Sequence, residues 1–423
     1  MKVSFFTIGC RLNQAETAAI AQSFIEKGCQ VVDFNSSADI AVINTCTVTE
    51  KGDAETHKAV NRAVSRNPKV KVALIGCQAQ TRKEALLALP NVQWVVGTEK
   101  KFALSDIVLS ECNAPRLIVP PVSRIDFTMP YSAADPRRTR VNLKIQDGCD
   151  FFCAYCEIPY ARGRARSRVF SDVLAEAERL AEKYKEIVLT GVNVGTYNSE
   201  GRTLLDLIDA LSKIDGIARI RISSIEGLTL PPTVFERMRS GKLCRHLHIS
   251  MQSAQDEVLR AMNRRYTVAE FRALLDLAAR QVPQICLGTD IIVGFPGETD
   301  EHFNETYDNL SAMPFAYFHV FSYSDRPHAK SRKLPNKVPQ PVIEERSRRL
   351  RALSFAKRHR FLESRLGETA TVLFEQQKNG WWTGLTDHYV RVLVKSSRPL
   401  HNELLPVRLL QVEGQSVIGT LDD

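Results

Sequence analysis

The sequence has no hydrophobic run long enough for a membrane helix. Its 423 residues are 44% hydrophobic and 25% charged, the mean hydropathy is -0.19, and no stretch approaches the roughly 18 apolar residues that such a helix needs. The apolar start of the chain, residues 1–8, is too short for a signal peptide and is typical of a first β-strand. We therefore predict a cytoplasmic protein without membrane contact, and the length predicts two or three domains.

Cysteine is scarce. Ten cysteines in 423 residues are far fewer than the share of about 8–10% that marks a disulfide scaffold. In a cytoplasmic chain of this size, cysteines at regular positions more often bind metal than form crosslinks. The composition thus argues against a disulfide-stapled domain, and the placement of the cysteines becomes the main question.

Negative charge is almost absent from one long segment. Residues 326–360 contain twelve Lys and Arg but only two acids, a net charge of +10, whereas the whole chain carries +9. A second basic run alternates arginine with small residues between positions 162 and 168. Solvated surfaces would explain such runs, but two of them beside a candidate active site favour contact with RNA phosphates. We assign RNA binding to Arg162, Arg164, Arg166, Arg168, Arg348, Arg349 and Arg351.

Strand-like and helix-like segments alternate through most of the chain, which predicts the α/β fold class. In residues 1–112 the pattern predicts a small parallel α/β domain, with strands at 2–8, 30–34, 39–44, 71–76 and 92–96. Residues 113–138 are rich in proline and lack periodicity, so we interpret them as a linker.

Two further domains are expected after the linker. Residues 139–365 contain six β/α units and end in a basic helix, which predicts a partial (β/α)6 TIM-like barrel with its chemistry at the C-terminal ends of the strands. Residues 366–423 are rich in Val, Thr and Leu, with turn signals at Asn379-Gly380 and Glu413-Gly414. This composition predicts a small antiparallel β-barrel.

Three cysteines lie on one short loop. Cys149, Cys153 and Cys156 form a C-x3-C-x2-C motif directly after a predicted strand. Three thiolates so placed can bind three irons of a [4Fe-4S] cluster and leave the fourth iron open. Zinc normally takes a fourth Cys or His, and no histidine lies in or near the loop, so a zinc site would need a distant ligand.

Three other cysteines share a different regularity. Cys10, Cys46 and Cys77 each come just after a predicted strand of the first sheet. Because the carboxyl ends of parallel strands form one edge, the three thiols could converge on a ligand. Buried structural cysteine is the alternative, since cysteine is among the most buried residue types. The cysteines without such a placement are interpreted as structural: Cys29, Cys112, Cys244 and Cys286.

These motifs resemble a known family. The three-cysteine loop is similar to the cluster loop of radical S-adenosylmethionine (SAM) enzymes, with Tyr155 at the usual aromatic position. The three-cysteine N-terminal domain, the barrel and a small C-terminal β-domain of the TRAM type resemble the methylthiotransferases over essentially the whole chain. The most specific segments are residues 7–14, 44–48 and 149–168.

Within that family, residues 158–164 and 189–197 are most similar to the branch that modifies N6-threonylcarbamoyladenosine in tRNA. Glu157 departs from the pattern, which has an apolar residue there, but this change removes no ligand. The resemblance implies a transferase that adds a methylthio group to carbon 2 of that nucleoside at position 37. It also implies tRNA as a partner and an electron donor such as flavodoxin or ferredoxin, and it leaves the oligomeric state open.

The resemblance further implies two [4Fe-4S] clusters and SAM as cofactors. Cys149, Cys153 and Cys156 would bind the cluster whose open iron chelates SAM, and one-electron reduction would yield a 5′-deoxyadenosyl radical. Cys10, Cys46 and Cys77 would bind the second cluster, which carries the sulfur to be methylated and transferred. Hydrogen abstraction by a radical needs no general base, so no acid–base residue is assigned.

Contacts to SAM are expected where the barrel strands end. Polar residues also terminate strands for turn reasons, which is the alternative. The candidate residues are Tyr155, Gly191, Val192, Asn193, Glu226, Ser250, Gln252, Ile292, Val293 and Gly294. In the tail, Trp381, Trp382, His388 and Tyr389 could either stack on unpaired bases or fill a barrel core.

Three rival functions remain at this stage. The same chemistry could act on isopentenyladenosine in tRNA or on an aspartate of a ribosomal protein. A non-enzymatic RNA-binding module, with cysteines that hold structural metal, is the third. Iron and sulfide analysis separates the last from the others, because two clusters contribute about eight irons per chain.

Overall fold

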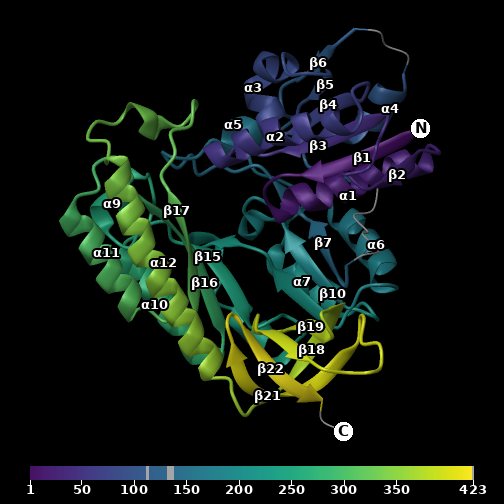
Figure 1. The fold of residues 1–423 in the computed structure, drawn as a ribbon. Helices are drawn as coiled ribbons and strands as arrows, with labels where there is room; N and C mark the ends of the chain where they lie inside the picture. Colours follow the sequence, from purple (N-terminus) through teal and green to yellow (C-terminus); the bar gives the residue numbers. More distant parts are fainter. Residues whose placement is uncertain (111–113, 131–137, 422–423) are drawn as a thin grey trace.

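The computed structural model describes residues 1–110, 114–130 and 138–421. The first part of the chain is a six-stranded parallel sheet in the order β2-β1-β3-β4-β5-β6 (Figure 1). The strands are β1 (Lys2–Thr7), β2 (Gln30–Val32), β3 (Ile40–Thr45), β4 (Lys71–Gly76), β5 (Val92–Val96) and β6 (Arg116–Ile118). The five predicted strands are therefore present, in a parallel sheet as expected.

Helices cover both faces of this sheet. Helices α2 (Glu50–Arg66) and α3 (Cys77–Leu87) pack with one buried cluster, whereas α1 (Arg11–Glu26) and α4 (Leu104–Leu109) pack with another. Strand β3 is buried along its whole length, since it lies in the middle of the sheet under both layers. Two-sided burial explains why its sequence is a continuous apolar run rather than an alternating one.

The sixth strand was not predicted. Strand β6 lies within the segment interpreted as a linker and pairs with Trp94–Val96 of β5. Further along the same segment, Phe127 forms an isolated parallel β-bridge with Arg168. The strand was missed for two reasons. Its three residues are too few to show a period-2 pattern, and the prolines around it indicated a loop. Residues 131–137 of the predicted linker and Cys112 lie outside the described residues.

The middle of the chain is an open barrel of parallel strands. Neighbouring strands follow one another in sequence. One sheet has the order β7-β10-β13 and the other β14-β15-β16-β17, and β14 follows β13 directly along the chain. The strands are β7 (Arg140–Lys144), β10 (Glu186–Thr190), β13 (Arg219–Ile222), β14 (Ile225–Glu226), β15 (His246–Ser250), β16 (Cys286–Val293) and β17 (Tyr317–Ser322). Strands β7 and β17 do not pair, so the barrel stays open on one side.

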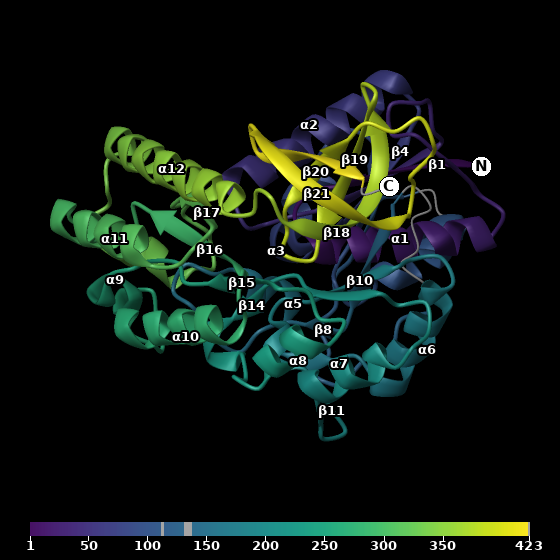
Figure 2. The same cartoon turned by 90° about the horizontal axis from the view of Figure 1, so that it is seen from below.

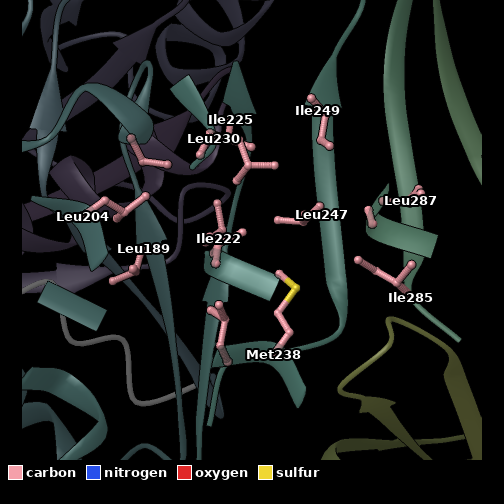
Figure 3. Packing of buried hydrophobic residues seen from close by; sticks show 14 of the residues in the cluster. Leu189, Leu204, Ile222, Ile225, Leu230, Met238, Leu247, Ile249, Ile285 and Leu287 are labelled. Carbon is pink, nitrogen blue, oxygen red and sulfur yellow. The ribbon is translucent and has the colours of Figure 1, made fainter. Parts of the chain in front are cut away.

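Helices surround the outside of this barrel (Figure 2). They are α6 (Phe170–Ala181), α7 (Leu204–Ser212), α8 (Val234–Ser240), α9 (Asp256–Ala261), α10 (Val268–Gln281), α11 (Asp300–Ala312) and α12 (Gln340–Glu363). Alternate strand residues, such as Leu189, Ile222 and Leu247, point outward and form one core with the helices (Figure 3). The other residues of each strand face the barrel interior, as strand alternation requires.

The tail forms a closed five-stranded barrel in the order β18-β19-β20-β22-β21. Its strands are β18 (Thr369–Lys378), β19 (Trp381–Thr386), β20 (Arg391–Val394), β21 (Leu404–Glu413) and β22 (Ser416–Leu421). Asn379 and Gly380 have φ of 51° and 79°, as a two-residue hairpin turn requires. The pairs are antiparallel except β20–β22, which is parallel and closes the barrel.

The tail barrel lies against the N-terminal ends of the central strands, at the opposite end from the N-terminal sheet (Figure 1). Arg219, at the start of β13, donates to the Leu385 carbonyl at 2.8 Å, and Arg221 donates to the Thr386 carbonyl at 3.1 Å. Arg245 forms an ion pair with Asp387 at 2.6 Å. Among the described helices, none combines the length and the apolar character needed to cross a membrane.

Candidate active site

The first three cysteines meet at one edge of the N-terminal sheet. Cys10 follows β1, Cys46 follows β3, and Cys77 begins α3 directly after β4. Arg162 links two of them, since it donates to the Cys77 Sγ at 3.1 Å and to the Asn13 Oδ1 at 2.6 Å, and that oxygen lies 3.9 Å from the Cys10 Sγ. The sheet order explains the convergence, because β1, β3 and β4 are neighbours and all end at this edge.

Two glycines allow this close approach. Gly9 has φ of +99°, and a Cβ there would lie 2.9 Å from the Cys46 Sγ. Gly76 has φ of +92°, and its Cβ would lie 2.3 Å from the Asn44 Oδ1. Both combine a backbone conformation that favours glycine with no room for a side chain. A larger residue at either position would push the strand ends apart.

Asn13 holds the strand ends together. Its Nδ2 donates to the carbonyls of Ile8, at 2.8 Å, and Thr45, at 3.1 Å. Its Oδ1 accepts a 2.6 Å hydrogen bond from Arg162. One buried side chain thus crosslinks the loops after β1 and β3 and joins both to the segment that follows the second cysteine motif.

The second triad lies on the loop between β8 (Gln146–Asp147) and α5 (Ile158–Arg162). The loop folds back on itself through a 3.0 Å bond from the Cys156 amide to the Cys153 carbonyl. Ala154 donates to the Met262 carbonyl at 2.9 Å, which anchors the loop to the central barrel. Arg264 donates to the Cys153 Sγ at 3.3 Å and also contacts Glu226 at a strand end.

The spacing of the sulfurs fits a cluster better than a single ion. Among the described residues, the only three or more Cys, His, Asp or Glu ligand atoms within 4.8 Å of one another belong to His248, Asp290 and His319. Four ligands around one zinc, with bonds of about 2.3 Å, require sulfurs roughly 4 Å apart. Neither cysteine triad is that narrow, whereas three corners of a [4Fe-4S] cube spread their thiolates more widely.

Burial raises the pKa of the thiols in both triads. It raises the pKa of Cys46 to about 12, of Cys156 to about 12 and of Cys149 to about 11, and it raises the pKa of Cys77 as well. Thiolates within each triad raise one another's pKa further. Three thiolates can share such a site only beside compensating positive charge, which bound iron provides.

A buried ion network joins the two triads. Arg162, from α5, donates to the Cys77 Sγ at 3.1 Å and pairs with Glu16 and Asp147, both at 2.9 Å. Lys101 and Lys144 pair with the same Glu16 at 2.6 and 2.7 Å. These cations hold the pKa of the Glu16 carboxyl far below its usual range, against the raising effect of its burial. The N-terminal sheet and the central barrel are therefore fastened directly beside the cysteines.

Glu157 provides a second link. The Thr47 hydroxyl, next to Cys46, donates a short hydrogen bond to the Glu157 carboxylate, next to Cys156. Arg326 and Arg82 lie 3.5 and 3.8 Å from the same carboxylate. The departure from the family pattern at Glu157 is thus matched by its surroundings, and it connects the two cysteine loops residue to residue.

The candidate SAM residues lie at or just after the strand ends, around the mouth of the central barrel. The Gln146 Oε1 accepts from the amides of Val192 and Asn193, both at 2.9 Å, which shapes the turn after β10. The buried Asn193 Nδ2 has no hydrogen-bond partner in the described residues, so it is a donor available to a ligand. Ile292 and Tyr155 pack against the same buried cluster, which includes Ala154 of the cysteine loop.

The remaining SAM candidates are more mixed. Ser250 uses its carbonyl to accept from Arg264 at 2.8 Å, and Glu226 is paired with the same arginine. Gln252, with φ of 76°, and Gly294, with φ of 80°, turn the chain at their strand ends. Val293 is 1% exposed and packs in the core outside the barrel. Its side chain therefore cannot contact a ligand in the mouth.

The arginine run at 162–168 does not form an RNA-binding surface. Arg162 and Arg168 are 1% and 0% exposed, and Arg168 is paired with Asp172 and Glu176. The Arg166 side chain is 8% exposed and lies 3.3 Å from Glu99. Arg164 alone reaches solvent, beside Asp150 at 3.2 Å. The alternation that suggested phosphate contacts instead reflects ion pairs, because carboxylates from both nearby and distant segments pack against it.

The basic segment before the tail is largely exposed. Arg348, Arg349 and Arg351 lie on the solvent side of α12. Four of the twelve basic residues are buried: Arg326, Arg346, Lys357 and Arg358. In the tail, Trp382 and His388 are buried, whereas Trp381 is half-buried under Lys395. Tyr389 faces the central barrel, where it stacks on His246.

Sequence reasoning missed the residues that contact the cysteines from outside their motifs. Arg264 and Arg162 each donate to a cysteine sulfur, and Glu157 was noted only as a deviation. Arg162 was predicted to bind RNA phosphates, but it binds the Cys77 sulfur and two buried carboxylates. The useful signal was a basic residue shortly after a cysteine loop, but sequence alone does not say whether it faces sulfur or solvent.

Comparisons with known proteins agree with this arrangement. Residues 143–310 match the Radical SAM superfamily, and residues 2–97 match the uncharacterized protein family UPF0004. The chain is 36% identical to the threonylcarbamoyladenosine tRNA methylthiotransferase MtaB of Bacillus subtilis (strain 168), over 98% of this chain and 96% of that protein. It is 37% identical to the MtaB protein of Aquifex aeolicus (strain VF5), over 93% and 96%.

A second kind of relative is slightly less similar. The tRNA-2-methylthio-N(6)-dimethylallyladenosine synthase of Cereibacter sphaeroides (strain ATCC 17029 / ATH 2.4.9) is 32% identical over 99% of this chain and 98% of its own. The solved radical SAM methyltransferase TsrM from Kitasatospora setae has a TM-score of 0.56 at 16% identity, covering 78% of this chain and 77% of that one, which supports the fold alone. The chain belongs to the methylthiotransferase family of radical SAM enzymes.

Proposed function

We propose that the protein transfers a methylthio group to carbon 2 of N6-threonylcarbamoyladenosine at position 37 of tRNA. The observation that carries the proposal is the pair of cysteine triads, joined by Arg162 and by the Thr47–Glu157 hydrogen bond. A methylthiotransferase needs a sulfur carrier beside a radical source, and this arrangement brings both candidate sites to one place. The greater identity to the MtaB relatives favours the threonylcarbamoyl nucleoside over the dimethylallyl one.

Enzymes of this family use SAM and [4Fe-4S] clusters. We assign one cluster to Cys149, Cys153 and Cys156 and the other to Cys10, Cys46 and Cys77, because both triads are too wide for one ion and each lies beside an arginine that can stabilise thiolate charge. When bound, these groups supply electron transfer, the hydrogen-abstracting species and the methylated sulfur. We assign SAM to the barrel mouth, where the Asn193 Nδ2 can donate to it.

The chain's own residues then position the reactants and exclude water. Glu157 and Arg162 fix the two cysteine loops relative to each other, so that substrate carbon and sulfur carrier can be held at a constant separation. Rigid placement of this kind lowers the entropy cost of bringing the reacting atoms together. The open side of the barrel, between β7 and β17, is the proposed entrance for the flipped nucleoside.

The tRNA is proposed to lie across the exposed basic face of α12. Eight of the twelve basic residues in 326–360 are exposed, which favours contact with phosphates. We retain the division into residues 1–112, 139–365 and 366–423 as a functional proposal: sulfur carrier, radical barrel and RNA-facing tail. A cytoplasmic electron donor such as flavodoxin or ferredoxin completes the scheme, in the compartment where tRNA is found.

The test is nucleoside mass spectrometry of tRNA from a strain that lacks this protein. We expect the methylthio form of threonylcarbamoyladenosine to disappear and its precursor to accumulate. The wild-type chain should restore the product, and the Cys153→Ala chain should not. Loss of methylthio-isopentenyladenosine instead, or unchanged tRNA with a changed ribosomal aspartate, would replace the proposed substrate.

A further inference from the structure

A cavity of about 320 Å³ opens between β17, α12 and the tail barrel. Its wall combines cationic and aromatic side chains, and none of its lining residues is acidic. The cationic and aromatic side chains of the wall include those of His319, Arg351, Arg358, Tyr317, Phe355 and Tyr389. Two arginines and a histidine around an aromatic-walled space suit a small anionic group joined to a flat one.

The cavity lies beside β17 at the open edge of the barrel, and its His319 wall faces the interior below the candidate cofactor site. Asp290 and Ile292 face the interior, because Ile291 and Val293 pack in the outer core. His319 pairs with Asp290 in the sheet register and faces the same way. A two-residue step along a strand is about 7 Å, so the wall at His319 begins one step below Ile292, which packs against the same buried cluster as Tyr155.

The polar groups of the cavity are held in different ways. Arg358 is buried, donates to the Tyr389 carbonyl at 2.7 Å and lies over the Tyr317 ring. His319 is oriented by Asp290, whose Oδ1 lies 3.2 Å from the His319 Nδ1 and 3.0 Å from the His248 Nε2. Two histidines therefore occupy the nearest carboxylate, which weakens its repulsion of an anion in the cavity.

Arg351 is the most available cation of the wall. Its side chain is exposed, and within the part of the chain that the structure describes its hydrogen bond to the Val320 carbonyl is long, at 3.3 Å. A guanidinium in this state loses little when it turns to a carboxylate and can bind it with two parallel hydrogen bonds. By contrast, Arg348 on the same helix already pairs with Glu345 at 2.8 Å.

We infer that this cavity binds the carboxylate of the threonylcarbamoyl substituent, with Arg351 as its main partner and with His319 and Arg358 in support. The inference rests on the proposed function and extends it to substrate choice. Carbon 2 must face the reactive groups at the barrel mouth, so the substituent on N6 is directed away from them, toward the interior. An apolar dimethylallyl group would leave these cations without a partner, and that difference would discriminate between the two nucleosides.

An RNA phosphate has the same charge as this carboxylate, and the experiment separates the two. Four anticodon stem-loop RNAs of one sequence would carry adenosine, N6-isopentenyladenosine, N6-threonylcarbamoyladenosine or the methyl ester of the last at position 37. Binding to the reconstituted full-length enzyme would be measured at fixed salt for wild type, Arg351→Met and the matched control Arg360→Met. Arg360 is exposed on the opposite side of α12.

Wild type should bind the threonylcarbamoyl RNA about tenfold more tightly than its methyl ester, as expected for one charge-assisted contact. Arg351→Met should remove most of that tenfold preference and leave the other three RNAs nearly unchanged. Arg360→Met should leave the ratio between the ester and the acid unchanged. Arg351→Met should also raise the KM for the threonylcarbamoyl RNA more than it lowers kcat, as expected for a binding contact.

Two results would overturn the inference while leaving the proposed function intact. An equal loss of affinity for all four RNAs would make Arg351 a phosphate contact, and an unchanged preference for the acid would place the carboxylate elsewhere. If wild type methylthiolates only the isopentenyl RNA, the proposed substrate itself is wrong and the inference fails with it. His319→Gln gives a second, independent variant, because it removes the ring that Asp290 orients and keeps a hydrogen-bonding group; it should reduce the preference for the acid over the ester, and an unchanged preference would remove His319 from the site.

Discussion

The two cysteine triads are built in opposite ways. Cys149, Cys153 and Cys156 come from a single eight-residue loop, whereas Cys10, Cys46 and Cys77 come from three strand ends spread over 68 residues. The loop triad combines short chain spacing and one local hydrogen bond with several anchors to the barrel, among them those of Met262, Asn263 and Arg264. The strand-end triad depends on sheet order, on two glycines without room for a Cβ, and on Asn13. One site is encoded by spacing, and the other by topology.

This difference has a consequence for robustness. The cysteines of a loop triad stay near one another when a remote contact changes, because only a few residues of chain separate them. A triad assembled from three strands moves whenever the sheet edge moves. The buried network of Arg162, Glu16 and Asp147 lies against this second triad, as expected if a site defined by topology needs additional fixing.

The largest expected effect comes from the loop triad. Replacing Cys153 by Ala should abolish formation of 5′-deoxyadenosine from SAM, because a cluster site with two remaining thiolates loses most of its affinity for iron. Chromatography of reaction mixtures measures this loss directly. Iron content should fall from about eight to about four per chain, since the other triad is separate. A variant that still produces 5′-deoxyadenosine at the normal rate would contradict the assignment of this loop.

The strand-end triad should separate the two activities. Replacing Cys46 by Ala should stop methylthiolation of tRNA but leave 5′-deoxyadenosine formation possible, because the loop triad is intact. Iron content should again be about four per chain. Methylthiolated nucleoside in normal amounts from this variant would instead make Cys10, Cys46 and Cys77 structural cysteines.

Removing the Arg162 guanidinium, which links the two triads, should lower the free energy of unfolding substantially. Arg162→Met leaves Glu16 and Asp147 buried with fewer partners, and breaking a buried pair costs about 3–5 kcal/mol. Arg164→Met is the matched control, because that side chain is half exposed and its pair with Asp150 is worth at most about 1 kcal/mol. Urea unfolding of the two variants measures the difference in the free energy of unfolding. Equal stability of both would show that the network does not hold the domains together.

The smallest expected effect concerns the RNA surface. Arg348→Ala combined with Arg349→Ala should weaken tRNA binding and reduce the slope of log affinity against log salt by about 1.4–1.8, at about 0.7–0.9 per phosphate contact. Arg272→Ala with Arg280→Ala removes the same charge from the exposed side of α10 and should leave that slope unchanged. Fluorescence titrations at several salt concentrations give both slopes. Identical slopes in the two double variants would remove α12 from the RNA-binding surface.

Much of the architecture was predictable because its signals are local. Strand and helix alternation depends on periodicity within each element, so the parallel sheet, the open barrel and the tail barrel were all anticipated, and the hairpin at Asn379-Gly380 follows from backbone preferences of two residues. Strand β6 was missed because three residues carry no period and prolines surround them. The parallel pair β20–β22 was missed because pairing between distant strands leaves no local mark.

The sequence by itself determined the cysteine motifs and the family, since spacing within a loop and the position of a residue after a strand are properties of the chain. Only the tertiary structure decided which arginines serve the site. Arg162 and Arg168 look the same in sequence as Arg164, yet burial pairs the first two with carboxylates while the third reaches water. The physical reason is that a charge is stabilised by whatever packs against it. Folding brings those partners from nearby turns, such as Asp172 and Glu176 for Arg168, or from far along the chain, such as Glu16 for Arg162.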